Sequence, residues 1–214
     1  MSDSIRRDNK GMSLIELMVG LVICAIVVAG IYRLFTAQSR AYNVQDQVAE
    51  VQQSIRSAME IMLRDLRMTG FDDDRTPLVT LPQPPVVAGD HSITVRYEHN
   101  GTLCEVRYWL EGGSILNRQE TQGGVTKTEP ILENVEAFNL VYGVDEDDDG
   151  AMDDRDGNGH LDDWVDAGTA GGLKVVSARA TLTARPVQLN PDLQSVTPRT
   201  LVSAVTFRNL SLLR

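Results

Sequence analysis

Cysteine and histidine are scarce in this sequence, and the signature motifs of common enzymes are missing from it. Cys24 and Cys104 are the only cysteines among 214 residues. One lies in an apolar run and the other in a strand-like run, so we expect no disulfide between them. The three histidines lack the spacing of metal ligands, and no GxSxG, P-loop or CxxC motif occurs. These absences predict a protein that is not an enzyme.

Positive charge is also in short supply, since the net charge is −10. This balance argues against a protein that binds the nucleic-acid backbone. Residues 145–166 hold 11 acidic residues and one arginine, so this segment carries the whole net charge. Hydrophobic residues make up 42% of the chain, which suffices for a sizeable core and excludes a wholly disordered protein.

Residues 12–35 form a long apolar run that contains only two charges, Glu16 and Arg33. About 20 apolar residues in a helix suffice to cross a bilayer. The preceding residues 1–11 include three basic side chains, which favours a cytoplasmic N-terminus. A plain membrane anchor and a secretory signal peptide are the alternatives, although the run exceeds the ~7–15 apolar residues of a signal peptide. We therefore expect a transmembrane helix over 12–35.

Glu16 is the unusual residue of this run. A carboxylate at the centre of a membrane helix costs ~2.5–3.5 kcal/mol on insertion scales, which marks such a residue as a functional candidate. No Lys, Arg or His lies within the next 16 residues. The partner of Glu16 must therefore come from another chain or from a freed amino terminus.

The segment from Lys10 to Met18, KGMSLIELM, resembles the cleavage signal of type IV prepilins. The resemblance implies that a prepilin peptidase removes the leader 1–11 by cutting after Gly11, and that the same enzyme methylates Met12. It also implies that Glu16 neutralises the N-terminal ammonium of a neighbouring subunit during assembly. Two features depart from the family: Met12 replaces the usual phenylalanine, and the helix-bending proline of many major pilins is missing, since Pro77 is the first proline.

A second helical pattern continues over 36–70. Apolar residues recur at steps of three and four from Ala37 to Leu66, which is typical of an amphipathic helix, and Gly70 is a suitable stop. A homodimeric coiled coil would explain such a stripe. Because the strands that follow need a helix to cover them, we expect the stripe to pack within the chain.

Residues at the end of this helix make the resemblance more specific. Residues 64–71, RDLRMTGF, are similar to a string typical of the PilW family of minor pilins, and 132–138 and 206–210 also resemble that family. The resemblance implies a minor pilin of a type IV pilus. The alternative is a minor pseudopilin of a type II secretion system, which shares the leader and the helix.

Residues 71–214 read as a β-rich domain. Strand patterns occur at 93–97, 104–110, 114–118, 137–142, 173–184 and 200–207, with the hairpin signal Asn100-Gly101 between the first two. Residues 72–90 read as an irregular connection. The expected fold is α+β and type IV pilin-like, with a long N-terminal α-helix, transmembrane in its first half, packed against an antiparallel β-sheet.

The acidic insert 145–166 has the spacing of calcium loops. Such loops place oxygen ligands at positions 1, 3, 5, 7, 9 and 12 and glycine at 6. The insert fits this pattern twice, so we expect one or two Ca²⁺ ions, with a solvated acidic loop as the alternative. The candidate ligands are Asp145, Asp147, Asp149, the Ala151 carbonyl, Asp153 and Asp156 in the first loop, and Asp154, Asp156, Asn158, the His160 carbonyl and Asp162 in the second; Asp163 or Asp166 would have to close the second.

The resemblance to type IV prepilins and PilW proteins implies a minor pilin that helps to prime pilus assembly in an initiating or tip complex. The expected partners are other minor pilins, the major pilin, the prepilin peptidase and the bacterial inner membrane. The globular domain would lie in the periplasm and later on the pilus at the cell surface. A membrane-anchored, calcium-dependent adhesin is a further alternative, for which Trp164 beside the acidic insert is the only aromatic candidate.

Overall fold

The computed structural model describes residues 11–72, 80–160, 163–186 and 197–211. The chain divides into two compact units, residues 1–46 and 47–214. A single helix, α1 (Leu14–Arg67), supplies the described helical residues of the first unit and enters the second. Its 54 residues contain no proline, so no backbone N–H is missing from the helical hydrogen-bond ladder. The long N-terminal helix predicted from the sequence is confirmed.

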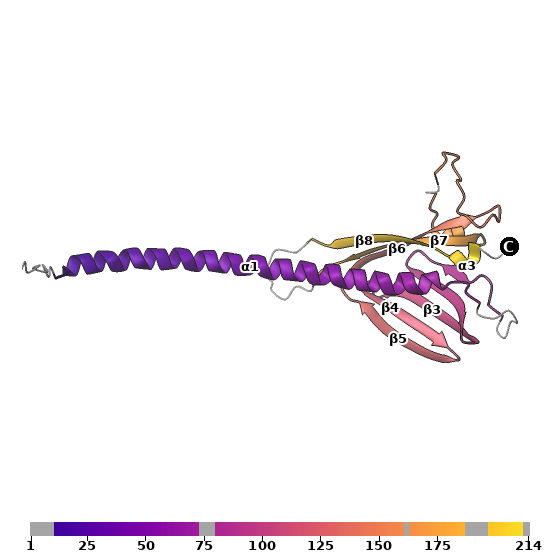
Figure 1. Ribbon diagram of the computed structural model, residues 1–214, viewed down its shortest axis with the longest axis horizontal. Helices are drawn as coiled ribbons and strands as arrows, with labels where there is room; N and C mark the ends of the chain where they lie inside the picture. The colour runs from indigo at the N-terminus through magenta and orange to yellow at the C-terminus, as the bar shows by residue number, and fades with distance from the viewer. Residues whose placement is uncertain (1–10, 73–79, 161–162, 187–196, 212–214) are drawn as a thin grey trace, which may run out of the picture. The chain divides into compact units, whose positions relative to one another are not determined.

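The second part of α1 packs on the β strands, as expected from its apolar stripe. Val51, Ile55, Met62 and Leu66 are buried within the chain, and Figure 1 shows this part of α1 alongside β3 and β4. The helix ends before Gly70, which has a φ of 71° and donates its backbone N–H to the Arg96 carbonyl at 2.9 Å. The left-handed conformation suits glycine and stops the helix.

Five antiparallel strands form the first sheet in sequential order: β1 (Val86–Ala88), β2 (Ser92–His99), β3 (Thr102–Glu111), β4 (Ile115–Gln122) and β5 (Val125–Leu132). Asn100 and Gly101 connect β2 to β3 with φ values of 52° and 69°, a two-residue turn in which both residues are left-handed. The predicted meander is confirmed. The prediction missed β1 and β5; β5 lies at the sheet edge and is exposed along its first half, so it lacks an alternating apolar pattern.

Three further antiparallel strands form a separate sheet in the order β6 (Val135–Asp145), β7 (Lys174–Ala184) and β8 (Arg199–Thr206). Two four-residue helices, α2 (Ala167–Ala170) and α3 (Arg208–Ser211), precede β7 and follow β8. The sequence predicted these three strands, but it predicted them in one sheet together with the strands of the first sheet, whereas the structure has two sheets. Strand patterns do not indicate where one sheet ends, and the connection between β5 and β6 changes the sheet here.

One hydrophobic core joins α1 to both sheets. Phe138, Tyr142, Tyr108 and Phe207 are among its fully buried side chains. The α+β arrangement expected from the sequence is therefore confirmed within residues 47–214.

A buried polar cluster fixes α1 to the first sheet. Asp65 on α1 accepts hydrogen bonds from the Tyr108 hydroxyl at 2.5 Å and from Arg118 Nε at 2.6 Å. Arg118 Nη1 also donates to Glu120 at 2.7 Å. Burial of the phenol raises the pKa of Tyr108, and the neighbouring Asp65 carboxylate raises it further. Sequence analysis did not identify this cluster, because its members lie on three separate elements.

Candidate functional site

Gly11 and Met12, the predicted cleavage and methylation residues, are exposed and precede α1. Exposure of this peptide bond is what a processing enzyme requires. Residues 1–10 of the predicted leader lie outside the described residues.

Glu16 lies in the first turn of α1 and is exposed within the single chain. The Ser13 carbonyl accepts the backbone N–H groups of Glu16 and Leu17 at 3.0 and 3.1 Å, so Ser13 occupies the cap position. The Ser-x-x-Glu spacing is that of a capping box, in which the glutamate stabilises the helix start. A carboxylate here also interacts favourably with the positive end of the helix dipole. Glu16 thus has a local role available in addition to its predicted intermolecular one.

The large apolar side chains from Met12 to Phe35, on both sides of Glu16, are all exposed within the chain. Met12, Leu14 and Phe35 have exposed fractions of 71%, 76% and 67%, and every large hydrophobic side chain between them is more than half exposed. A continuous apolar surface of this kind marks a membrane or protein contact. Among the described helices, α1 is the one long and apolar enough to cross a membrane.

The first predicted calcium loop follows β6, in the segment that projects from the second sheet (Figure 1). Carboxylate oxygens of Asp145, Asp147 and Asp149 lie within 4.8 Å of one another. Asp145 accepts the backbone N–H groups of Asp149 at 3.1 Å and Gly150 at 2.9 Å. Gly150, at position six, has a φ of 88°. The backbone thus turns sharply around the Asp145 carboxylate.

The second predicted loop repeats this arrangement nine residues later. Asp154 accepts the backbone N–H groups of Asn158 at 3.1 Å and Gly159 at 2.6 Å. These hydrogen bonds, the Gly159 one above all, lower the pKa of Asp154. Carboxylate oxygens of Asp154, Asp156 and Asp163 lie within 4.8 Å of one another.

The remaining predicted ligands divide between the two loops. Asp156 joins the second group rather than the first, while Asp153 accepts the Glu146 backbone N–H at 2.5 Å. His160 is exposed, and its backbone N–H donates to the Asn158 side chain at 2.7 Å. Ala151 is exposed at the tip of the first loop, and Asp162 lies outside the described residues.

Lys174 distinguishes the two loops electrostatically. Its Nζ lies 3.0 Å from Asp145 and 2.5 Å from Asp148. Burial raises the pKa of Asp145, but the hydrogen bonds from Lys174 and the Gly150 amide outweigh it, so this pKa lies below its ordinary value. The hydrogen bond with Asp148, and after it the one with Asp145, raise the pKa of Lys174. A metal ion in the first loop would have to displace this ammonium group.

The loops are attached to the sheet at both ends. Tyr142 on β6 and Val165 exchange two backbone hydrogen bonds of 2.8 and 2.9 Å, and the Met152 side chain contacts Ser177 on β7. Trp164, the candidate adhesin residue, is half-buried and lies under the Arg179 guanidinium at 4.7 Å. The base of the two loops is therefore fixed to the sheet, and the Trp164 ring already contacts the Arg179 guanidinium.

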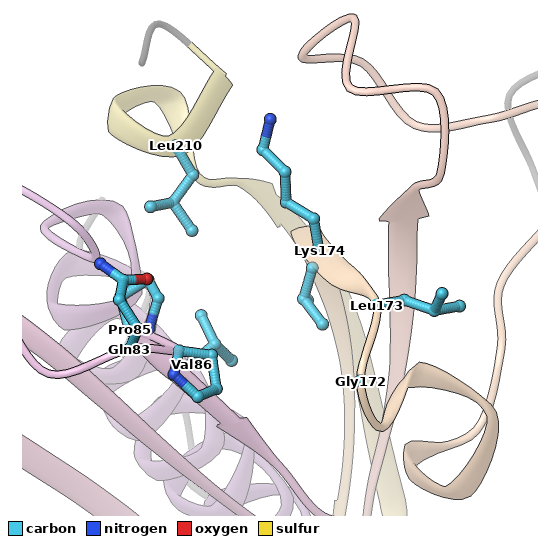
Figure 2. A pocket seen from close by; sticks show the side chains of 9 residues that line it. Gln83, Pro85, Val86, Gly172, Leu173, Lys174 and Leu210 are labelled. Atoms are coloured by element: carbon cyan, nitrogen blue, oxygen red, sulfur yellow. The ribbon is translucent and has the colours of Figure 1, made fainter. Parts of the chain in front are cut away.

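A cavity of about 430 Å³ lies between the segment before β1 and the start of β7 (Figure 2). Val86 and Leu210 contribute apolar surface, and Lys174 lies across from Leu210. The Lys174 ammonium is held by the acidic loop, and the described lining residues include no aspartate, glutamate, histidine, cysteine or serine that could act with it in acid–base or nucleophilic chemistry. His91 is the histidine closest in sequence to the lining residue Val86, and its Nδ1 lies at hydrogen-bond distance, 2.7 Å, from the Phe138 carbonyl oxygen.

Comparison with known proteins identifies the N-terminal part of the chain. Residues 6–32 match the prokaryotic N-terminal methylation motif. No curated protein matches the chain. The motif and the exposed apolar surface of α1 together support anchoring in the inner membrane and processing by a prepilin peptidase. The chain thus has a type IV prepilin-like N-terminus.

Proposed function

We propose that this chain is a minor pilin of a type IV pilus, and that it helps to prime assembly in an initiating or tip complex with other minor pilins and the major pilin. The observation that carries the proposal is the methylation motif over 6–32, followed by one uninterrupted helix that enters a β domain. The helix surface from Leu14 to Phe35 is apolar and exposed, so it can pass from lipid to the core of a helical bundle.

The similarity of residues 64–71 to PilW proteins supports the pilus rather than the secretion assignment. In this structure the segment contains Asp65, the residue that fixes α1 to the first sheet, and Gly70, which ends the helix. A pseudopilin of a type II secretion system remains the alternative. Deletion of the gene should abolish or reduce surface pili under the proposal, whereas loss of protein secretion with normal pili would favour the alternative.

Processing tests the N-terminal part of the proposal. The mature protein should begin at a methylated Met12, and its intact mass should lack residues 1–11. Gly11→Leu should block cleavage and leave the full-length chain in the membrane fraction. Recovery of the uncleaved wild-type chain from assembled filaments would contradict the proposal.

We also propose that the acidic loops bind Ca²⁺. The supporting observation is that two groups of three carboxylates each converge within 4.8 Å. Calcium prefers several hard oxygen ligands, and even a weak site of ~10⁻⁴–10⁻³ M would be filled at extracellular concentrations. The second loop has no lysine beside its three carboxylates among the described residues, which favours it for occupancy.

Thermal unfolding of the full-length chain in detergent tests this binding. Ca²⁺ should raise the melting temperature over chelator, and the stabilisation should reach about 2.7 kcal/mol when Ca²⁺ is in hundredfold excess over Kd. Magnesium should do less, because it keeps its waters and prefers a rigid octahedron. Asp154→Ala with Asp156→Ala should remove the effect of the second loop. The control, Asp46→Ala with Glu60→Ala, removes the same charge elsewhere and should retain the effect of Ca²⁺ on the melting temperature. A wild-type melting temperature that does not change with Ca²⁺ would refute the proposal.

A further inference from the structure

The two sheets have four edge strands, and three of them carry features that hinder pairing with another chain. β1 has only three residues, β5 contains Lys127 and Pro130, and the register of β6 shifts twice. Short edges, lysine, proline and bulges are the usual protection of an edge strand. β8 has none of them: its eight residues pair with β7 in an unbroken register.

The second edge of β8 is unpaired in the part of the chain that the structure describes. Among the described residues, no backbone hydrogen bond joins this edge to another segment, because β8 is the last strand of its sheet. Val202, in the middle of the strand, is 53% exposed. An edge of this kind offers a row of N–H and C=O groups to an incoming strand.

Two hollows lie between β8 and α1, one at each end of the strand. Their volumes are about 520 and 680 Å³. We call them together the α1–β8 groove, which Gln52, Ile55, Arg56, Pro198, Arg199, Thr200 and Leu201 line at one end, and Arg67, Met68, Phe71, Ala204, Val205, Thr206, Arg208 and Asn209 at the other. Side chains beside an added strand would thus find apolar surface on the helix side.

The charge of this groove is opposite to that of the chain. Its described lining residues include Arg56, Arg67, Arg199 and Arg208 and no aspartate or glutamate, although the net charge of the chain is −10. Arg199 Nε is buried and has no hydrogen-bond partner within residues 11–72, 80–160, 163–186 and 197–211. A buried donor without a partner is unfavourable, and an incoming carboxylate would relieve this cost.

We propose that β8 binds an extended, acidic segment of another protein chain, which adds a strand to the second sheet and places carboxylates against Arg199 and Arg56. Strand addition obtains affinity from main-chain hydrogen bonds and specificity from side-chain pockets. A second copy of β8 fits poorly, because pairing would bring the arginines of both copies together. The inference rests on the groove and is independent of the pilus assignment.

Binding of a model peptide tests the inference. The probe is a fluorescein-labelled peptide of alternating glutamate and valine, eight residues long to match β8, titrated by anisotropy against the full-length chain in detergent. Saturable binding is expected, and Arg56→Glu with Arg199→Glu should weaken it at least about tenfold, because both charge contacts become repulsive. The control, Arg40→Glu with Arg107→Glu, makes the same charge change away from the groove and should bind as the wild type does.

Two altered peptides separate strand addition from simple charge attraction, and both are tested on the unmodified chain, so the result does not depend on the folding of a variant. A lysine–valine peptide should not bind. A glutamate–valine peptide that is N-methylated at alternate residues keeps the charge but loses the main-chain donors, and it should bind far more weakly. No saturable binding of the first peptide, or equal binding of the N-methylated one, would overturn the proposal.

Discussion

Replacing Arg118 with leucine should destabilise the β domain more than replacing Asp65 with leucine. Both side chains are buried, with exposed fractions of 7% and 4%. Arg118 contacts three carboxylates: Asp65 at 2.6 Å, Glu120 at 2.7 Å and Glu129 at 3.6 Å. Asp65 has Tyr108 as its other buried partner, at 2.5 Å. The two substitutions therefore leave different charges behind.

Removal of one member of a buried ion pair costs about 3–5 kcal/mol. Asp65→Leu leaves Arg118 with Glu120, so the loss should lie near 3 kcal/mol, the low end of that range. Arg118→Leu removes the cation of Glu120 and leaves the buried Asp65 with only the exposed Arg64, at 3.7 Å, so the loss should approach 5 kcal/mol. The double leucine variant removes both buried charges and should lose less than the sum, because apolar replacement of a whole pair is often nearly neutral.

Thermal unfolding of the full-length chain in detergent, followed by near-ultraviolet circular dichroism, measures these differences. For a domain of 150–250 residues, 1 kcal/mol shifts the melting temperature by about 2–4 °C. Asp65→Leu should thus lower it by about 6–12 °C and Arg118→Leu by about 10–20 °C. Equal losses for the two single variants, with their sum in the double variant, would refute the assignment of a coupled buried cluster.

Three further experiments test other contacts. Burial, the largest cause, raises the pKa of Tyr97 from 10.0 to about 12. Because the phenol loses its proton at lower pH in the unfolded chain than in the folded one, the free energy of unfolding should fall as the pH rises from 10 to 12. Tyr97→Phe should make that fall shallower, as measured by urea unfolding. Gly70→Ala should cost about 2–3 kcal/mol, because φ is 71° and the new methyl group would overlap Leu210, whereas Gly124→Ala, with φ 82° and open space, should cost only the backbone strain of about 1–2 kcal/mol. Glu16→Gln keeps the capping-box pattern but not the charge, so it should reduce incorporation into filaments as much as Glu16→Ala; recovery by glutamine would favour a capping role alone.

The parts of this fold that the sequence predicts are those that depend on neighbouring residues. The apolar steps to Leu66, the stop at Gly70 and the Asn100-Gly101 turn each occupy a short stretch of chain, and each lies where expected. The role of Asp65 could not be predicted in this way. Its partner Arg118 is 53 residues away, and a polar residue near an apolar stripe reads as a solvent contact unless the tertiary structure is known.

The acidic insert shows the same limit at a candidate site. The local spacing of acidic residues and glycine repeats in the two loops, and in both the first aspartate, Asp145 or Asp154, accepts the backbone N–H groups four and five residues later. The position of Lys174 depends instead on the pairing of β6 with β7, whose register places it opposite Asp145. By spacing, the first loop has a ligand at each of the six positions, whereas the second lacks one at position twelve. Strand register gives that loop an ammonium group of its own, so the free energy of binding an ion there includes the cost of displacing Lys174, a cost that the second loop does not share.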